Sequence, residues 1–450
     1  MILRLKGRSS IFRASSAMTA APAYNESVPL EKRYILKTVL VATCKTWGSP
    51  AMLPYLLRDA RASVSAFSPW HLSLNPYVRE HVTASRDAAE AATQLVDLLS
   101  YRRFDWVVIA DDYLLEAVVE RCDLADPPPW LPFDRRNGDA LSLLLSKHEF
   151  AERAPRFGIP VAESYFASTI EEVTLQANRF GFPIVVKGEH GSAGDAVFIA
   201  HDLAALQRES AKLLLASKRV LVQRFVKGPL AAADVLYDRG EVVGYSPHLL
   251  DCHFPFAVSA STVRARFVHP ALDAIVGAVG AATGFHGLAG INLVQDEKTG
   301  ELYVLEVNPR PTAGFSDGPA SRAFFAPLVA AFLEGKAARA RVYDGPTSAQ
   351  FPAYLLYFLL RSDKRSLQSY RRAFNSLAKF RPDNAGLAAW EIARFVRDQG
   401  RRLRPKVFVD AMKGIFVSVL GPAVWLLCKT LEWVVDQYDR YVESVTRRAR

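Results

Sequence analysis

The sequence predicts an α/β fold divided into more than one domain. Near the N-terminus, the apolar runs KTVLVA and DWVVIA are each followed by a helical segment, and such alternation is typical of a parallel sheet. Residues 179–200 read as a strand, a glycine-rich loop and a second strand, and residues 287–308 as two strands joined by a polar turn. With 450 residues the chain also exceeds one comfortable hydrophobic core, so two or three domains are expected.

The composition is that of an ordinary globular protein, with 50% hydrophobic and 23% charged residues. The four cysteines are scattered without CxxC spacing, which argues against a disulfide framework and against a zinc site. A reducing compartment fits this pattern, so we expect a cytoplasmic protein.

Residues 1–33 are interpreted as a flexible N-terminal segment. They contain no acidic side chain before Glu26 and lack the apolar core of a secretory signal. A transit peptide would also fit their composition, but a disordered start is the preferred interpretation.

A buried strand that enters a loop at residues 37–47, and a strand, loop and helix at residues 105–122, follow. Asp111 and Asp112 stand where the second strand ends, at the edge where α/β sheets bind ligands. They either face a substrate or cap the next helix, and capping is the preferred interpretation. The run DPPPW at 126–130 is typical of a stiff linker into a second domain.

Two lysines are candidates for binding phosphate. Lys147 lies on a short amphipathic helix that ends near Gly158, where a lysine is by itself usually just solvated. Lys187 ends the strand PIVVK and is followed by three glycines in seven residues. Small residues let backbone N–H groups approach phosphate oxygens. A hairpin with a flexible tip is the alternative for this segment.

The most informative stretch is the second strand of the hairpin, LYVLEV, which runs into Asn308, Pro309 and Arg310. A lone carboxylate in an apolar strand, Glu306, is costly to bury unless a cation meets it. Asn308 and Arg310 follow at i+2 and i+4 and therefore point to the same face. The stretch predicts a site for a hard cation, with a solvated edge strand as the alternative.

The order of these segments, Lys147, then Lys187 with its glycine loop, then QRFVKG and EVNPR (306–310), resembles the ATP-grasp superfamily. Carbamoyl phosphate synthase, biotin carboxylase and D-alanine–D-alanine ligase share that fold. The resemblance covers residues 140–335 well and the preceding ~100 residues loosely. It implies a Rossmann-like pre-grasp domain at 34–130 and a two-lobed ATP-grasp domain at 131–340, with a small nucleotide lobe at about 157–226. A basic, mostly helical C-terminal extension at 341–450 would complete the chain.

The resemblance implies a binding site for ATP. Lys147 and Lys187 would hold its phosphates, and Lys187 would also take part in catalysis. The mobile loop over the β- and γ-phosphates would comprise Gly191, Ser192, Ala193 and Gly194. The hinge between the lobes, where the adenine is bound, would comprise Gln223, Arg224, Phe225 and Val226.

The resemblance also implies a Mg²⁺ (or Mn²⁺) site, with Glu306 and Asn308 as ligands and Arg310 as the catalytic cation beside the transferring phosphoryl group. The third ligand position holds Asn292, where the family usually has Asp or Glu. An amide oxygen can bind the metal but brings no charge, so one of the two metal sites is expected to be weaker.

The implied function is that of an ATP-dependent carboxylate–amine ligase with small-molecule substrates. The γ-phosphoryl group would pass to a carboxylate, and an amine or similar nucleophile would displace phosphate from the acyl phosphate. Because Asn292 puts efficient catalysis in doubt, the alternative is an ATP-binding module with little or no turnover, a sensor or scaffold.

Arg264 and Arg266 alternate in the run VRARF, which places both on one face of a strand. They are weak candidates for binding the substrate carboxylate, and a solvated edge strand is about as good an interpretation.

The whole net charge lies near the C-terminus, where residues 351–450 carry 19 Lys and Arg against 9 Asp and Glu. The uncharged run at 414–428 is too short for a transmembrane helix. Its basic flanks and tryptophans suit a peripheral membrane helix, but a cap docked on the grasp domain or on a second subunit of a homodimer is slightly favoured. The basic run RDQGRRLRPK (397–406) has no nucleic-acid recognition motif beside it, which argues against nucleic acid as a partner.

Overall fold

The computed structural model describes residues 36–46, 48–122, 126–134, 136–188, 196–253, 261–315, 319–336, 341–345 and 348–349. From Lys37 onward these residues belong to one compact unit. The predictions for the N-terminal segment, for the glycine loop at 191–194 and for residues 351–450 fall outside the described residues. None of the helices in the described ranges is long and apolar enough to cross a membrane.

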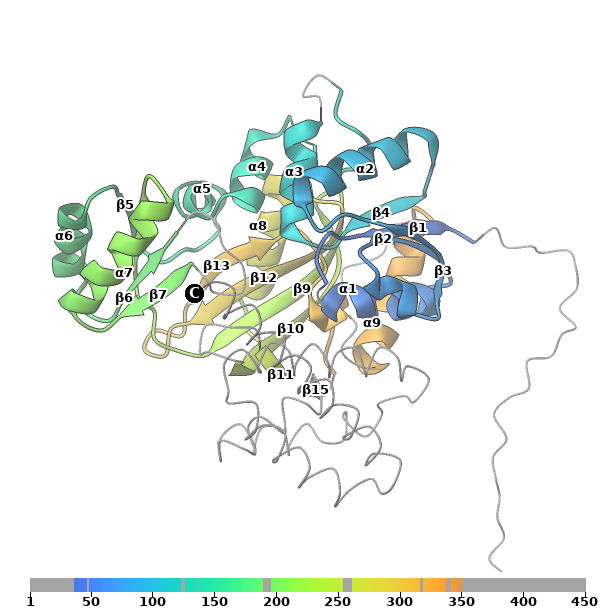
Figure 1. The fold of residues 1–450 in the computed structure, drawn as a ribbon. Helices are drawn as coiled ribbons and strands as arrows, with labels where there is room; N and C mark the ends of the chain where they lie inside the picture. The colour runs from blue at the N-terminus through green and yellow to red at the C-terminus, as the bar shows by residue number, and fades with distance from the viewer. Residues whose placement is uncertain are drawn as a thin grey trace, which may run out of the picture. The chain divides into compact units, whose positions relative to one another are not determined.

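The N-terminal part is a parallel sheet in the order β3-β2-β1-β4, as predicted from its strand–helix alternation (Figure 1). Strand β1 is central and apolar, and its residues 39–42 are completely buried. The strands are β1 (Thr38–Ala42), β2 (Ser63–Ser68), β3 (Val78–Thr83) and β4 (Trp106–Ile109). The helices are α1 (Gly48–Asp59), η1 (His71–Leu74, 3₁₀), α2 (Ala88–Tyr101) and α3 (Asp112–Arg121).

Asp111 joins two strands of this sheet and caps α3, which confirms the capping interpretation for this residue. One carboxylate oxygen accepts from the N–H of Leu114 at 2.9 Å, as an N-cap does. The other accepts from the N–H of Cys44 and the hydroxyl of Thr43, both at 2.8 Å. Asp111 is completely buried, so its role is structural.

A short connection leads into α4 (Gly138–Leu145), α5 (Lys147–Arg153) and the 3₁₀ turn η2 (Ala154–Phe157). The predicted end of this helical segment is confirmed, because Gly158 has a φ of 74° and closes the turn.

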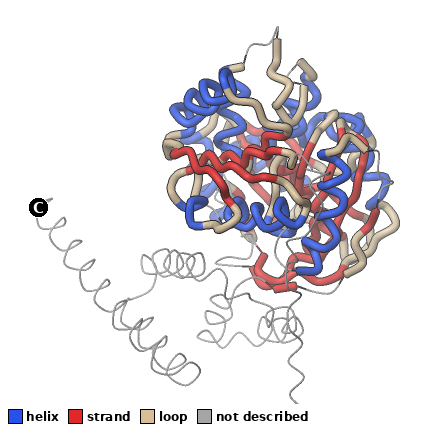
Figure 2. Tube along the Cα trace, turned by 90° about the vertical axis from the view of Figure 1, so that its right-hand side faces the viewer, coloured by secondary structure: helices blue, strands red, loops and turns tan. Residues whose placement is uncertain are grey.

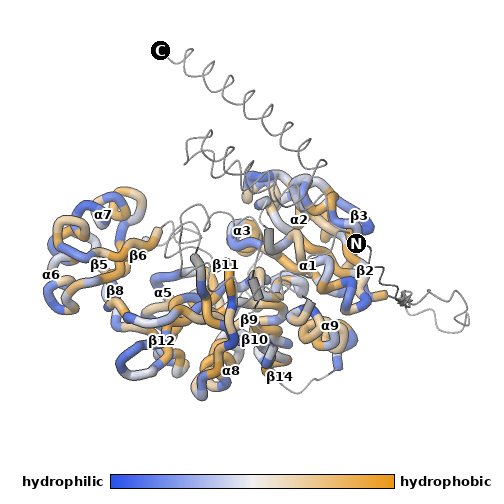
Figure 3. Tube along the Cα trace, turned by 90° about the horizontal axis from the view of Figure 1, so that it is seen from below, coloured by the Kyte–Doolittle hydropathy of each residue, from blue (hydrophilic) through white to orange (hydrophobic). Residues whose placement is uncertain are grey.

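A four-stranded antiparallel sheet, in the order β5-β8-β6-β7, follows as a small lobe. It consists of β5 (Ser164–Ala167), α6 (Ile170–Phe180), β6 (Ile184–Lys187), β7 (Val197–Ala200), α7 (Leu203–Ala216) and β8 (Val220–Arg224). Apolar side chains of both helices share one core with the strands. In Figure 3 these strands are mostly orange, whereas α6 and α7 carry blue and white segments.

The larger sheet has the order β13-β12-β9-β10-β11-β15, with β14 paired to β10. Its strands are β9 (Leu230–Asp238), β10 (Glu241–His253), β11 (Ser261–Arg266), β12 (Gly287–Gln295), β13 (Leu302–Asn308), β14 (Arg341–Val342) and β15 (Ser348–Ala349). The helices are α8 (Leu272–Thr283), η3 (Ala313–Phe315, 3₁₀) and α9 (Pro319–Leu333). The predicted hairpin is the β12–β13 pair, with Gly300 at φ 77° in its turn.

The two faces of strand β9 have different neighbours. Odd-numbered residues such as Val235 and Tyr237 share a core with α8, and the Tyr237 hydroxyl donates to the Val276 carbonyl at 2.8 Å. On the even face, Leu236 packs in the same cluster as α9, and Asp234 and Ala232 follow along the strand. Helices lie against the sheets in Figure 2. The even face of β9 therefore carries the buried acid Asp234.

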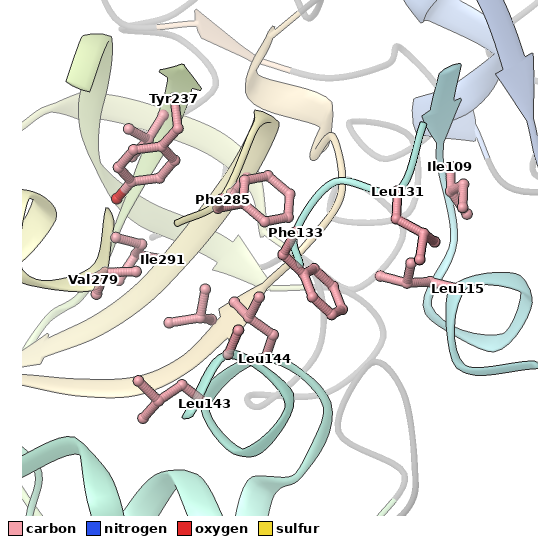
Figure 4. Close-up of a cluster of buried hydrophobic side chains, with 14 of the residues drawn as sticks. Ile109, Leu115, Leu131, Phe133, Leu143, Leu144, Tyr237, Val279, Phe285 and Ile291 are labelled. Carbon is pink, nitrogen blue, oxygen red and sulfur yellow. The ribbon is translucent and has the colours of Figure 1, made fainter. Parts of the chain in front are cut away.

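One apolar core runs from the N-terminal sheet into the larger sheet. Directly after the predicted stiff linker, Leu131 and Phe133 are buried in this core. In Figure 4, Leu131 lies beside Ile109 and Leu115, and Phe133 lies between Phe285 and Leu144. The linker thus ends in packed side chains that contact both sheets.

Candidate functional site

A β-bulge sets the direction of Glu306. Asn292 lies opposite Glu306, but the next residue of β12 lies opposite Val304, so Leu305 is an extra residue in β13. Val304 and Val307 are both buried, whereas Leu305 and Glu306 are both partly exposed. The bulge therefore turns Leu305 and Glu306 to the same face of the sheet.

The predicted metal ligands lie together on this face. The Asn292 side-chain amide donates to Oε1 of Glu306 at 2.7 Å, and that of Asn308 does so at 3.4 Å. Arg310 in turn donates from Nη2 to Oδ1 of Asn308 at 3.1 Å. The described residues hold no group of three His, Cys, Asp or Glu side chains fit for a metal. One carboxylate and two amides still fit a hard cation, because turning each amide replaces its N–H donors by an oxygen ligand.

Lys187 ends β6 with its side chain almost wholly buried, at 8% exposure. The pKa of Lys187 is lowered to about 8, chiefly by burial; the charge of Glu306 opposes this change, and the charge of Lys147 contributes to it. The two predicted phosphate lysines and the predicted metal ligand are thus electrostatic neighbours. A buried ammonium group of this kind is stabilised by an anion, and phosphate supplies one.

An apolar patch adjoins the polar residues on the same face. The bulge residue Leu305 belongs to it, together with Val226 from the segment after β8. The whole patch consists of Ala162, Val226, Leu230, Val294, Tyr303 and Leu305. A flat apolar ring could pack here while the groups attached to it reach Glu306.

The predicted hinge residues have different environments. Val226 lies in the apolar patch, and Phe225 is partly exposed. The buried side chain of Gln223 donates to the Ser164 hydroxyl at 2.8 Å, within the small lobe. The guanidinium of Arg224 lies 5.3 Å from the centre of the Tyr303 ring. The Arg224 side chain therefore joins the lobe to the larger sheet, whereas Gln223 is bound within the lobe. An adenine contact by either residue stays a prediction.

The first turns of α3 contribute acids that sequence reasoning did not place in the site. Asp112 accepts from Nε of Arg310 at 2.8 Å. Glu116, one turn further along, has its pKa raised to about 7 by burial and by the charge of Asp112, while Lys147 opposes the change. The sequence feature that could have placed these acids in the site is the position of Asp112 at the carboxyl edge of the sheet, with a second acid at i+4.

Asp234 is a buried acid on the even face of β9 and anchors the segment that follows Asn308. It accepts a hydrogen bond from the Thr312 hydroxyl, and Nδ1 of His248 lies 3.5 Å from its other oxygen. A side chain at Gly314 would collide with this carboxylate, since its Cβ would lie 1.7 Å away. The position of the Asp234 carboxylate therefore requires a glycine at residue 314.

The two arginines of β11 separate in the structure. Arg264 is partly buried, and the charge of Asp234 supports its pKa against the lowering caused by burial. Arg266 is exposed and pairs with Asp344. Arg264 therefore stays a candidate for binding the substrate carboxylate. Arg266 is instead paired with a carboxylate at the surface.

A family model described as an ATP-grasp domain matches residues 152–314. The carbamoyl phosphate synthase large chain of Archaeoglobus fulgidus is 29% identical over 181 residues. That match covers 38% of this chain and 17% of the relative, so the chain spans only a small part of its length.

Two solved structures share the fold at low sequence identity. The N5-carboxyaminoimidazole synthetase of Staphylococcus aureus complexed with ADP has a TM-score of 0.55 at 15% identity, covering 74% of this chain and 86% of that one. The biotin carboxylase domain dimer of Hydrogenobacter thermophilus 2-oxoglutarate carboxylase, with MgADP, ADP and bicarbonate, has a TM-score of 0.54 at 16% identity. It covers 69% of this chain and 72% of that one.

Proposed function

We propose that the chain is an ATP-dependent ligase of the ATP-grasp superfamily, because the ATP-grasp family model matches residues 152–314. It would bind Mg-ATP between its two lobes and activate a carboxylate as an acyl phosphate for attack by an amine or similar nucleophile. The N-terminal sheet would be the Rossmann-like pre-grasp domain, the region after 340 a basic helical extension, and the setting cytoplasmic.

One observation carries the proposal: a buried lysine, Lys187, interacts electrostatically with Glu306, which accepts hydrogen bonds from Asn292 and Asn308 and has an apolar patch on the same face. Lys187 and Lys147 would hold the phosphates, and the apolar patch would hold the adenine. The Glu306 group would hold Mg²⁺ (or Mn²⁺), which when bound supplies positive charge to the phosphate oxygens.

In the proposed reaction the protein aligns the reacting groups and supplies positive charge. A carboxylate is too poor an electrophile for an amine, so its oxygen first takes the γ-phosphoryl group, with ADP as the leaving group. Lys187 and Arg310 would stabilise the charge that spreads over the transferring group. The amine nitrogen then bonds to the acyl carbon, the C–O bond to phosphate breaks, and the nitrogen loses a proton.

A second candidate is an ATP-binding module with little turnover, and Asn292 is the observation that favours it. This neutral residue lies directly opposite Glu306, where the family usually has an acid, so the ligand group carries a single negative charge.

ADP release separates the two candidates. The purified full chain is incubated with Mg-ATP and pooled carboxylates and amines, beside the Lys187→Ala variant. Pool-dependent ADP formation that the variant lacks supports the ligase. Nucleotide binding in a thermal shift assay without any pool-dependent turnover supports the binding module, and absence of binding contradicts both.

Asn292→Asp tests whether the amide weakens the metal site. We expect the Mg²⁺ concentration for half-maximal nucleotide binding to fall by about threefold to tenfold, because a second carboxylate is added to the ligand group. Without Mg²⁺ the variant should be less stable than the parent, since the added carboxylate would face Glu306 at hydrogen-bond distance. A titration of nucleotide binding against Mg²⁺ measures this.

Asn137→Asp is the matched control, because it adds the same charge at the N-cap of α4, where an aspartate also caps. Its Mg²⁺ dependence should equal that of the parent. An unchanged Mg²⁺ dependence in Asn292→Asp would contradict a ligand role for this position.

A further inference from the structure

The neighbouring acids at the end of β4 face different partners. Asp111 is bound to the backbone and side chains of its own sheet. Asp112, the first residue of α3, instead reaches Arg310, which lies 198 positions later in the chain. The second acid therefore connects the N-terminal sheet to the segment after β13.

The Asp112–Arg310 pair is shielded from solvent. The Nε–Oδ2 distance is 2.8 Å, and the side chains are 27% and 14% exposed, respectively. Burial raises the pKa of Asp112 while the Arg310 guanidinium opposes this, so the carboxylate depends on Arg310 for its charge. In contrast, the Arg102–Glu80 pair of the same sheet is 32% and 48% exposed.

Arg310 is held from two directions. Asp112 accepts from Nε, and Asn308, a proposed metal ligand, accepts from Nη2 at 3.1 Å. The backbone beyond Arg310 is anchored to the sheet by Thr312, which donates to Asp234. A planar guanidinium bound at two of its nitrogens has little freedom to rotate.

We infer that Asp112 is a positioning residue for Arg310, by which the N-terminal sheet sets the direction of the arginine in the active site. The inference rests on the proposed role of Arg310 beside the transferring phosphoryl group. Asp112 acts through the arginine and takes no part in the chemistry, and phosphoryl transfer is sensitive to small errors in such alignment.

The test is a double-mutant cycle on the full chain with Asp112→Asn, Arg310→Ala and the double variant. Asp112→Asn keeps the size of the side chain and removes its charge. We expect it to lower turnover about tenfold while the KM for Mg-ATP changes less than threefold. In the Arg310→Ala background the same change should have no further effect, because the group through which it acts is gone.

Glu80→Gln is the matched control, since it removes the acid of an exposed arginine pair in the same sheet. Its turnover should equal that of the parent, because exposed pairs contribute little. Equal losses from Asp112→Asn in both arginine backgrounds would overturn the inference, as would unchanged turnover in the single variant.

A binding measurement covers the case in which the proposed ligase activity itself fails. The ratio of the Kd values for Mg-ADP and for the non-hydrolysable analogue β,γ-imido-ATP reports contacts to the terminal phosphate without turnover. We expect Asp112→Asn to change this ratio at least threefold when Arg310 is present and to leave it unchanged in Arg310→Ala. A ratio that Asp112→Asn leaves unchanged, or changes equally in both backgrounds, contradicts the inference whatever the parent's turnover.

Discussion

Replacing Glu306 with glutamine is expected to lower ATP turnover by a factor of about 100 to 1,000. Among the three proposed metal ligands Glu306 alone is charged, because the other two are Asn292 and Asn308. Its carboxylate also supports the charge of Lys187, whose pKa is already lowered by burial. The substitution therefore weakens the metal site and a phosphate contact together.

The fold should tolerate Glu306→Gln. Glutamine has nearly the same volume, and its side-chain oxygen can still accept from the Asn292 amide. Turnover with Mg-ATP is measured beside the thermal unfolding midpoint, which should move by only a few degrees. Glu297→Gln is the control, since Glu297 lies in the turn of the same hairpin and pairs with exposed Lys227 at 2.6 Å. A Glu306→Gln protein that keeps a third of the parent's turnover would contradict the assignment.

Local spacing was sufficient to predict much of the polar group. The i, i+2 and i+4 positions of Glu306, Asn308 and Arg310 are connected in the structure by hydrogen bonds from one residue to the next. A polar side chain at the end of a strand has few directions available, so the period of two predicts which side chains meet. Likewise Gly158 and Gly300 mark the ends of elements because their backbones need positive φ.

The bulge at Leu305 could not be predicted in this way. Tyr303 and Leu305 share the face of Glu306, although strict alternation would place Leu305 and Glu306 on opposite faces. Only pairing with β12 reveals the extra residue, since an apolar run such as LYVLEV fits either phase. The apolar patch beside the polar group follows from this shift of phase.

Contacts between residues that are distant in sequence could not be predicted either. Asp111 and Asp112 are identical in type and adjacent, yet one caps a helix and the other pairs with Arg310. Local rules reached the cap, because its partner is three residues away. The ion pair depends on how two sheets pack against each other. No pattern in the sequence near Asp112 predicts that packing.

Lys187 is expected to lower the stability of the ligand-free protein while it strengthens nucleotide binding. Its pKa of about 8 lies below the usual 10.5, so near pH 7 its charge costs about 3 kcal/mol of unfolding free energy. Lys187→Met keeps an unbranched side chain of similar volume and removes the charge. This variant should therefore be more stable by up to about 3 kcal/mol at pH 7, and should bind Mg-ATP at least about tenfold more weakly.

The pH dependence of stability and of nucleotide binding provides a second measurement of the Lys187 charge. Because the folded pKa is the lower one, the unfolded chain binds more protons between pH 8 and 10.5, and the ligand-free protein gains stability from this group as pH rises through that window. A bound phosphate raises the pKa of Lys187. Nucleotide binding then takes up a proton above pH 8, and the Kd for Mg-ATP should rise by up to about tenfold per pH unit.

The two trends oppose each other, and both should disappear in Lys187→Met. Denaturant unfolding and calorimetric Mg-ATP titrations at pH 7, 8 and 9 measure them. Lys212→Met is the control, because Lys212 is an exposed lysine on α7 and its removal should alter neither quantity. If Lys187→Met destabilised the ligand-free protein at pH 7, the buried charge would have a permanent partner within the fold, and its assignment to phosphate would fail. A gain in stability together with a loss of binding would identify Lys187 as a charge that the fold keeps for a ligand.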